Sequence, residues 1–448
     1  MQTNKLFIMV VMFLAVLFSP RFILAGEPLT LEASIDIALK NSLVLNMAKE
    51  GTKSATALKK EAMTGFFPKF STSYSYSRLN EAPFSRFQGL PAGPLYGMNG
   101  MEIPVGTEDN YNWIIEAKQP VFAGGAILAN YQASRIGEEI ARLEETAKFQ
   151  DVIQDVKTAY FDILRAQAME KVAAQSVEML KAHRDVAENY FQVGMIPKND
   201  LLYAEVELAN GTQTRVTARN AVELARSRFN TVLKRPLSEP VDIVDLLAYH
   251  PFNTSFEECL NIARQSRPEL KMSSLKAVQA GKYVRVAQGD YYPALSVVGN
   301  YSRFGDEASV SGSDYKDAES WYVMAAASWN FWEWGRTKFK VDAGKARANQ
   351  AIDADKELND QVVLEIKKAY LMLQETESRI SVSQKLIEQA EENFRIAEER
   401  YKERVATSTE VLDAQTLLRR AKFEYVNALT EYNINDARLQ RAMGTIRL

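Results

Sequence analysis

The sequence is poor in the residues that form covalent cross-links and metal sites. Its 448 residues include one cysteine, Cys259, and two histidines, His183 and His250, which lie far apart in the chain. A single cysteine excludes an internal disulfide and a zinc site built from several cysteines. We also find no phosphate-binding loop, nucleophile elbow or cluster of metal ligands. The sequence therefore predicts a protein that is not an enzyme and that holds no metal or cofactor.

An excess of positive charge is also missing. Lysine and arginine number 54 against 57 aspartate and glutamate residues, which gives a formal net charge of -3. Proteins that bind nucleic acid usually carry a clear basic excess or a basic stripe. We therefore expect no nucleic-acid partner.

Only one apolar run approaches the length of a membrane helix. It covers residues 6–18, follows Lys5 and ends before Pro20. At about 13 residues it is shorter than the ~20 residues of a spanning helix, and a cleavage site is available after Ala25. These features predict a signal peptide over residues 1–25, with an uncleaved anchor as the alternative. Since no other run comes near that length, any further membrane crossing has to be built from strands.

Proline is absent from two long stretches, residues 125–196 and 294–448. In the first stretch apolar residues recur at helical spacing, as at Val152, Val156, Tyr160 and Ile163. A helix from Gly125 to about residue 193 would be on the order of 100 Å long. Each long helix is expected to end in a short turn, at residues 193–199 and 404–409, and the chain then runs back. We therefore predict two long coiled-coil hairpins, over residues 125–234 and 335–444.

The two halves of the sequence resemble each other. Residues 31–38 read LEASIDIA and residues 256–263 read FEECLNIA, and an FFP triplet at 66–68 matches YYP at 291–293. From Gly125, which pairs with Gly335, the two halves stay in register to the end of the repeat. We interpret the chain as a first repeat over residues 26–235, a proline-containing linker over 236–252 and a second repeat over 253–448. Short helices are expected at the start of each repeat, at residues 31–41 and 256–266.

Each repeat also contains two segments in which residues alternate in character. Phe70, Thr72, Tyr74 and Tyr76 share one face of the first segment, and serines occupy the other. We predict strands over residues 66–78, 111–123, 291–303 and 320–332, with exposed loops at 79–110 and 304–320. Aromatic residues gather at one end, which is typical of the interfacial belt of a membrane barrel: Phe66, Phe67, Phe122, Tyr291, Tyr292, Trp329, Trp332 and Trp334. The alternative is a half-buried sheet in a soluble domain.

Four strands cannot close a membrane barrel, since the smallest closed barrels use about eight. Open edges would leave backbone groups unsatisfied in lipid, at several kcal/mol each. We therefore expect three copies to close a 12-stranded barrel continued by a tube of helices. The predicted fold class is mainly α with a membrane β-barrel.

The repeat order, the FFP and YYP junctions and the segment VLDAQ at residues 411–415 resemble the TolC-like outer-membrane efflux proteins. The resemblance covers nearly all of the chain after residue 25. It implies a homotrimer in the outer membrane of a Gram-negative bacterium, in contact with its lipid, whose helical tunnel projects into the periplasm. It also implies a periplasmic adaptor and, through that adaptor, an inner-membrane pump. The competing interpretation is a periplasmic coiled-coil scaffold without transport activity.

Glu410 and Asp413 lie three residues apart and so share a helix face. The resemblance implies that three copies of this pair surround the narrowest point of the channel and favour cations. The alternative is an ordinary helix start, where acidic residues are also favoured.

The resemblance further implies that Val193, Gly194 and Met195 take part in adaptor docking, and that Asn199 and Asp200 contact an arginine of the second hairpin to close the tunnel. This sequence departs from that pattern, because Ala406 replaces the arginine and Arg404 stands where glycine is usual. We expect Asp200 and Arg404 to form the closing contact, with Lys198 as the other candidate cation.

Overall fold

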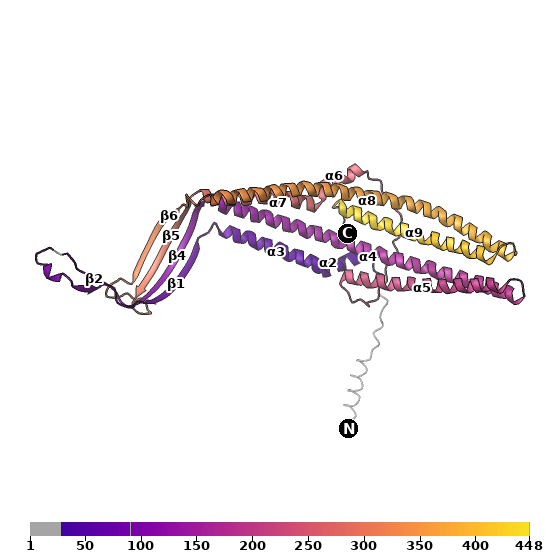
Figure 1. Cartoon of the computed structure of the whole chain (residues 1–448), viewed down its shortest axis with the longest axis horizontal. Coiled ribbons are helices and arrows are strands. Elements are labelled where there is room, and N and C mark those ends of the chain that lie inside the picture. The colour runs from indigo at the N-terminus through magenta and orange to yellow at the C-terminus, as the bar shows by residue number, and fades with distance from the viewer. Residues whose placement is uncertain (1–27, 90, 448) are drawn as a thin grey trace, which may run out of the picture. The chain divides into compact units, whose positions relative to one another are not determined.

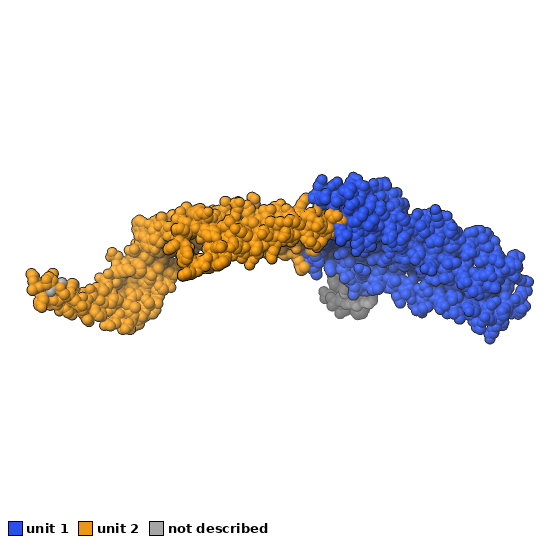
Figure 2. All heavy atoms as spheres, turned by 45° about the horizontal axis from the view of Figure 1, so that its top comes forward, with its two compact units in different colours: residues 1–45, 149–266, 364–448 blue, residues 46–148, 267–363 orange. Residues whose placement is uncertain are grey.

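The computed structural model describes residues 28–89 and 91–447, so the predicted signal peptide over residues 1–25 lies outside the described residues. The chain divides into two compact units (Figure 2). Unit 1 contains residues up to 45 together with 149–266 and 364–448, and unit 2 contains residues 46–148 and 267–363.

The elements occur in the same order in both halves of the chain (Figure 1). The predicted short helices have the expected bounds, Leu31–Asn41 and Phe256–Ser266, and the two longest helices contain 67 residues each. The first half consists of α2 (Leu31–Asn41), α3 (Leu43–Thr64), β1 (Lys69–Arg78), β4 (Asp109–Ala123), α4 (Ala126–Gln192) and α5 (Lys198–Leu233). The second consists of α6 (Phe256–Ser266), α7 (Pro268–Gln288), β5 (Ala294–Gly305), β6 (Glu319–Ser328), α8 (Arg336–Lys402) and α9 (Ser408–Ala442).

Unit 2 contains a four-stranded antiparallel sheet with the order β1-β4-β5-β6 (Figure 1). Its register places aromatic and apolar residues together on one face, since Tyr74 pairs with Trp113 and Ile115 pairs with Tyr301. The serines of β1 fall on the opposite face, where Ser75 pairs with Asn112. The outer edges of β1 and β6 have no partner strand among the described residues. The sheet is therefore apolar on one face, polar on the other, and open at both sides.

The predicted strand segments differ from the observed strands at their ends. Residues 66–68 lie in a turn before β1, and residues 289–291 form the short 3-10 helix η2 before β5. Pro68 and Pro293 explain both late starts, because proline has no N–H to donate to a strand ladder. Residues 329–332 lie beyond β6, since Ser328 already pairs with Ala294 at the start of β5.

The prediction of an exposed loop over residues 79–110 was also incomplete. This segment contains a small hairpin of β2 (Phe84–Arg86) and β3 (Glu102–Pro104), with the 3-10 helix η1 (Tyr96–Met98) between them. An ion pair between Arg86 and Glu102 joins the two strands. Three-residue strands are too short to produce a recognisable alternation.

A buried carboxylate joins α3 to α4 in unit 2. Glu138 lies 2.5 Å from Lys59 Nζ and 2.9 Å from Arg142 Nη2, and it accepts a hydrogen bond from Thr56 at 3.0 Å. The hydrogen bonds from Lys59 and Arg142 lower the pKa of Glu138 to about 2. The carboxylate is therefore charged at neutral pH, and its charge is matched.

The linker after α5 covers one face of the helices of unit 1. The buried Tyr160 hydroxyl donates to the carbonyl oxygens of Leu29 at 3.1 Å and Val244 at 2.7 Å. Asn230 of α5 donates to Glu239 O at 2.8 Å, and Tyr432 of α9 donates to His250 O at 2.5 Å. Apolar side chains of α2, α4, α5, α9 and the linker form the main core beside these contacts. Among the described residues, no helix has both the length and the apolar character needed to cross a membrane.

Candidate functional site

The candidate site lies at the turns of the two helical hairpins, both in unit 1. The first turn follows α4, where Gly194 has a φ of 73°. Its N–H donates to Phe191 O at 2.9 Å, and the N–H of Met195 donates to Tyr190 O at 2.8 Å. These two bonds close the last turn of α4 and require a residue that tolerates the left-handed conformation. They leave the side chains of Val193 and Met195 exposed at the end of the hairpin.

The second turn repeats this geometry without glycine. Arg404 has a φ of 65°, and its N–H donates to Tyr401 O at 3.0 Å. The N–H of Val405 donates to Arg400 O at 2.8 Å, and the Val405 side chain is exposed like that of Val193. An L-residue in this conformation costs roughly 1–2 kcal/mol. Arg404 is therefore held in a strained conformation at the position equivalent to Gly194.

Glu410 and Asp413 lie in the first two turns of α9, and both are exposed. Glu410 also has a local role, because it forms a capping box with Thr407. One oxygen of its carboxylate accepts from Thr407 N at 3.2 Å, and the other lies 3.5 Å from Arg400 Nη1. Asp413 takes part in none of the ion pairs among residues 28–89 and 91–447. The two carboxylates therefore lie on the same side of α9, where Glu410 is tied to the turn and Asp413 is exposed.

The expected contact between Asp200 and Arg404 is not formed within a single chain. No ion pair among the described residues includes either side chain, and the Asn199 side chain is exposed. Asp200 is half-buried near Tyr401 instead. Burial, together with the negative charge of Asp200, raises the pKa of Tyr401. Within one chain the first hairpin therefore meets the second through Tyr401.

The structure adds a residue to the candidate site that the sequence analysis left aside. His183 of α4 is only 8% exposed, and its Nε2 lies 2.8 Å from Ser408 Oγ at the start of α9. Its ring also packs against Tyr401, with 5.0 Å between the ring centres. Its position in the sequence indicates that it is buried. His183 lies three residues after Leu180 and four before Ala187, within the apolar stripe of α4.

These contacts make His183 a direct link between the two hairpins. Ser408 is two residues before Glu410, so the link lies next to the carboxylates expected to surround the channel. Burial lowers the pKa of His183, and the charge of Glu398 on α8 opposes this effect. The side chain is therefore neutral at neutral pH.

The chain is similar in sequence and in fold to outer-membrane proteins. A family model described as "Outer membrane efflux protein" matches residues 34–233 and 259–445. The sequence is 22% identical over 390 residues to "Outer membrane protein TolC" of Escherichia coli. The aligned region covers 83% of this chain and 77% of the relative. The structure is similar to the CmeC outer membrane channel of Campylobacter jejuni, with a TM-score of 0.79, 19% identity and coverage of 93% of this chain and 85% of that one. It is also similar to the outer membrane protein VceC of Vibrio cholerae, with a TM-score of 0.78, 17% identity and coverage of 92% and 96%.

The contact of His183 with Ser408 generates a prediction about pH. Because the folded pKa of His183 is depressed, its contribution to hairpin packing is complete above its ordinary value of about 6.5 and is lost as the pH falls through the lowered value. We expect the amide protection factors at the start of α9 to fall between pH 7.5 and pH 5. Hydrogen exchange of the purified protein measures this change.

The matched control is His183→Gln, which keeps a polar side chain but does not titrate in this range. The variant should show little dependence of protection on pH in this segment. An equal decrease in the native protein and in His183→Gln would assign the effect to groups other than His183.

Proposed function

Because the chain belongs to the outer membrane efflux protein family, we propose that it forms a passive trimeric duct that leads from the periplasm to the exterior. In this proposal the duct is the outer-membrane part of a tripartite efflux or type I secretion system. The helical hairpins project into the periplasm, and their turns gate the channel. The chain performs no catalysis.

The observation that carries the proposal is the sheet with two open edges. Its apolar face carries Tyr74, Trp113 and Tyr301, and its polar face carries the serines of β1. In a bilayer the apolar face would contact lipid, and the unpaired edges of β1 and β6 would have to pair with neighbouring copies. Two copies would supply about eight strands, which close with an interior filled by side chains, whereas three copies leave an open lumen.

The helices offer a second surface for neighbouring copies. A groove of about 600 Å³ between α8 and α9 is lined by apolar side chains that include Val382, Leu386 and Leu417. All three are exposed, as is Leu224 on α5 at 72%. The α5 side of one copy can cover the α8 and α9 side of the next, and three such contacts close a ring.

The hairpin turns give the duct its gate and its docking surface. We propose that Glu410 and Asp413 of three copies surround the periplasmic constriction and attract cations. Val193, Gly194 and Met195, together with Val405, present apolar side chains and accessible backbone at the ends of the hairpins. These ends are the proposed contact for a periplasmic adaptor, which connects the duct to an inner-membrane pump.

The first experiment tests assembly. We expect the protein to fractionate with outer membranes and, after detergent extraction, to have the mass of a trimer by light scattering. A monodisperse monomer that retains its strands would contradict the proposed closure. Fractionation with soluble periplasmic proteins would favour the alternative, a coiled-coil scaffold.

The second experiment tests the constriction. Glu410→Gln and Asp413→Asn remove charge while keeping size, and glutamine is accepted in a capping box. In planar bilayers the double variant should lose most of its preference for cations and become less sensitive to block by trivalent cations. Glu399→Gln, which removes a carboxylate paired with Arg395 at 2.7 Å, is the control and should leave both properties unchanged. If the double variant behaves like the control, the two carboxylates lie away from the channel.

The third experiment tests the closing contact, which we propose to form between Asp200 of one copy and Arg404 of its neighbour. A charge-assisted hydrogen bond there would contribute about 1.5–3 kcal/mol if shielded and less if exposed to water. Asp200→Asn and Arg404→Gln should each raise spontaneous conductance, and the double variant should add little. Additive effects on the free energy of opening would rule out a direct pair.

A further inference from the structure

A cavity in unit 1 has no role in the proposed gate. It has a volume of about 440 Å³ and receives one arginine from each of four helices. These are Arg165 of α4, Arg228 of α5, Arg379 of α8 and Arg438 of α9. Asp162, Glu375 and Glu431 line the same cavity.

The cavity lies on the face of the helices that the linker does not cover. A step of two residues along a helix corresponds to a rotation of about 200°. Asp162 therefore lies on the face of α4 opposite Tyr160, and Glu375 lies on the face of α8 opposite Glu377. Tyr160 contacts the linker through Val244, and Glu377 does so through Tyr249. In the proposed duct the linker-covered face is the outer one, because the same additional layer from every copy would fill the lumen. The cavity then opens toward the lumen.

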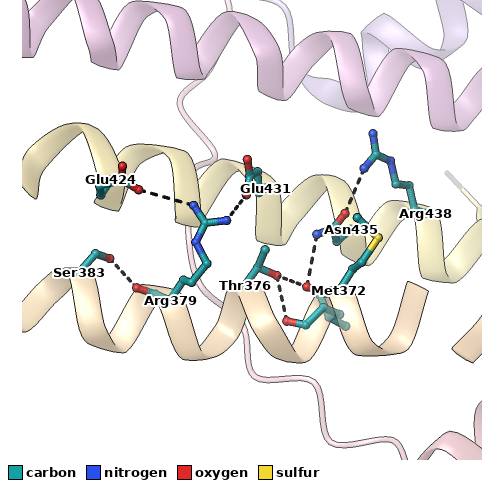
Figure 3. A network of polar contacts seen from close by, with 9 residues as sticks. Met372, Thr376, Arg379, Ser383, Glu424, Glu431, Asn435 and Arg438 are labelled. Carbon is teal, nitrogen blue, oxygen red and sulfur yellow. Dashed lines mark hydrogen bonds and ion pairs between the residues drawn. The ribbon is translucent and has the colours of Figure 1, made fainter. Parts of the chain in front are cut away.

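The charges in the cavity are unevenly matched. Arg165 Nη2 lies 2.5 Å from one oxygen of Asp162, and Arg228 Nη1 lies 3.7 Å from the other, so two guanidinium groups share one carboxylate. Within residues 28–89 and 91–447, the guanidinium of Arg438 donates only to the neutral amide oxygen of Asn435, at 3.1 Å (Figure 3).

Arg379, in contrast, has two carboxylates as partners. It lies between Glu431 at 2.6 Å and Glu424 at 3.6 Å (Figure 3). The positive charge without a matching carboxylate is therefore concentrated on Arg165, Arg228 and Arg438.

We propose that Arg165, Arg228 and Arg438 form an anion-binding site in the wall of the duct, which takes the carboxylate, phosphate or sulfonate groups of passing cargo. Guanidinium groups present paired N–H donors that match such oxygen atoms. The inference rests on the proposed function, since it places the cavity inside the duct. It assigns anionic organic solutes to the cargo, although the constriction at the hairpin turns is acidic.

Glu375 limits the strength of this site. Its side chain is exposed, lines the cavity and belongs to none of the ion pairs among the described residues. A carboxylate facing the cavity repels a bound anion and so speeds its release. A site inside a conduit has to release its ligand as readily as it takes it up.

The test is block of single channels by inorganic pyrophosphate in planar bilayers, with the full-length protein. Pyrophosphate should reduce the conductance of the native channel, and Arg438→Gln should raise the half-blocking concentration about three- to tenfold. Glu375→Gln should lower it. Arg226→Gln is the matched control, because Arg226 lies on α5, pairs with Glu223 at 2.9 Å and lines a separate cavity beside the linker. It should leave block unchanged.

The outcomes separate this inference from the proposed function. The anion site is wrong if the channel conducts but pyrophosphate does not block it. It is also wrong if pyrophosphate blocks the Arg438→Gln and Arg226→Gln variants equally. Both results leave the proposed duct unaffected. Absence of conductance in the native protein and also in the Asp200→Asn and Arg404→Gln variants, which should weaken the gate, contradicts the duct. In that case equilibrium dialysis of pyrophosphate against the purified protein decides the site: binding that is lost in Arg438→Gln supports it, and no binding overturns it.

Discussion

Backbone hydrogen bonding at the two edges of one sheet determines how this chain can exist in a membrane. Each strand of the sheet pairs with its neighbours inside the chain, but in the part of the chain that the structure describes β1 and β6 each keep one unpaired side. Water can satisfy such groups at a protein surface, whereas hydrocarbon cannot. In the proposed duct, pairing of these edges brings several copies together. The same association would place the hairpins side by side and create the proposed gate, the lumen and the sites in its wall.

Much of the fold could be predicted from the sequence because the repeat supplies each element twice. The absence of proline indicated the two 67-residue helices, and alternation indicated the four long strands. The ends of the strands were less predictable, because aromatic residues such as Trp329 continue the pattern after the partner strand has ended. The β2–β3 hairpin was missed because its strands are three residues long and lie in a segment rich in glycine and proline.

The candidate site was less accessible to sequence reasoning. Both hairpin turns were predicted, but the left-handed conformation of Arg404 was not, because arginine gives no sign of it. His183 was considered only as a metal ligand with local neighbours. Its partner Ser408 lies 225 residues away. The four arginines of the cavity come from four different helices, so no local pattern in the sequence joins them.

The equal length of α4 and α8 constrains how such a protein can change during evolution. One residue inserted into α4 alone would move its turn by about 1.5 Å and rotate every following side chain by about 100°. His183 would then no longer face Ser408, and the two hairpins would end at different heights. An insertion of seven residues nearly restores the rotation and lengthens the helix by about 10 Å. Longer or shorter relatives of this chain should therefore differ by whole heptads, gained or lost in both halves of the sequence together.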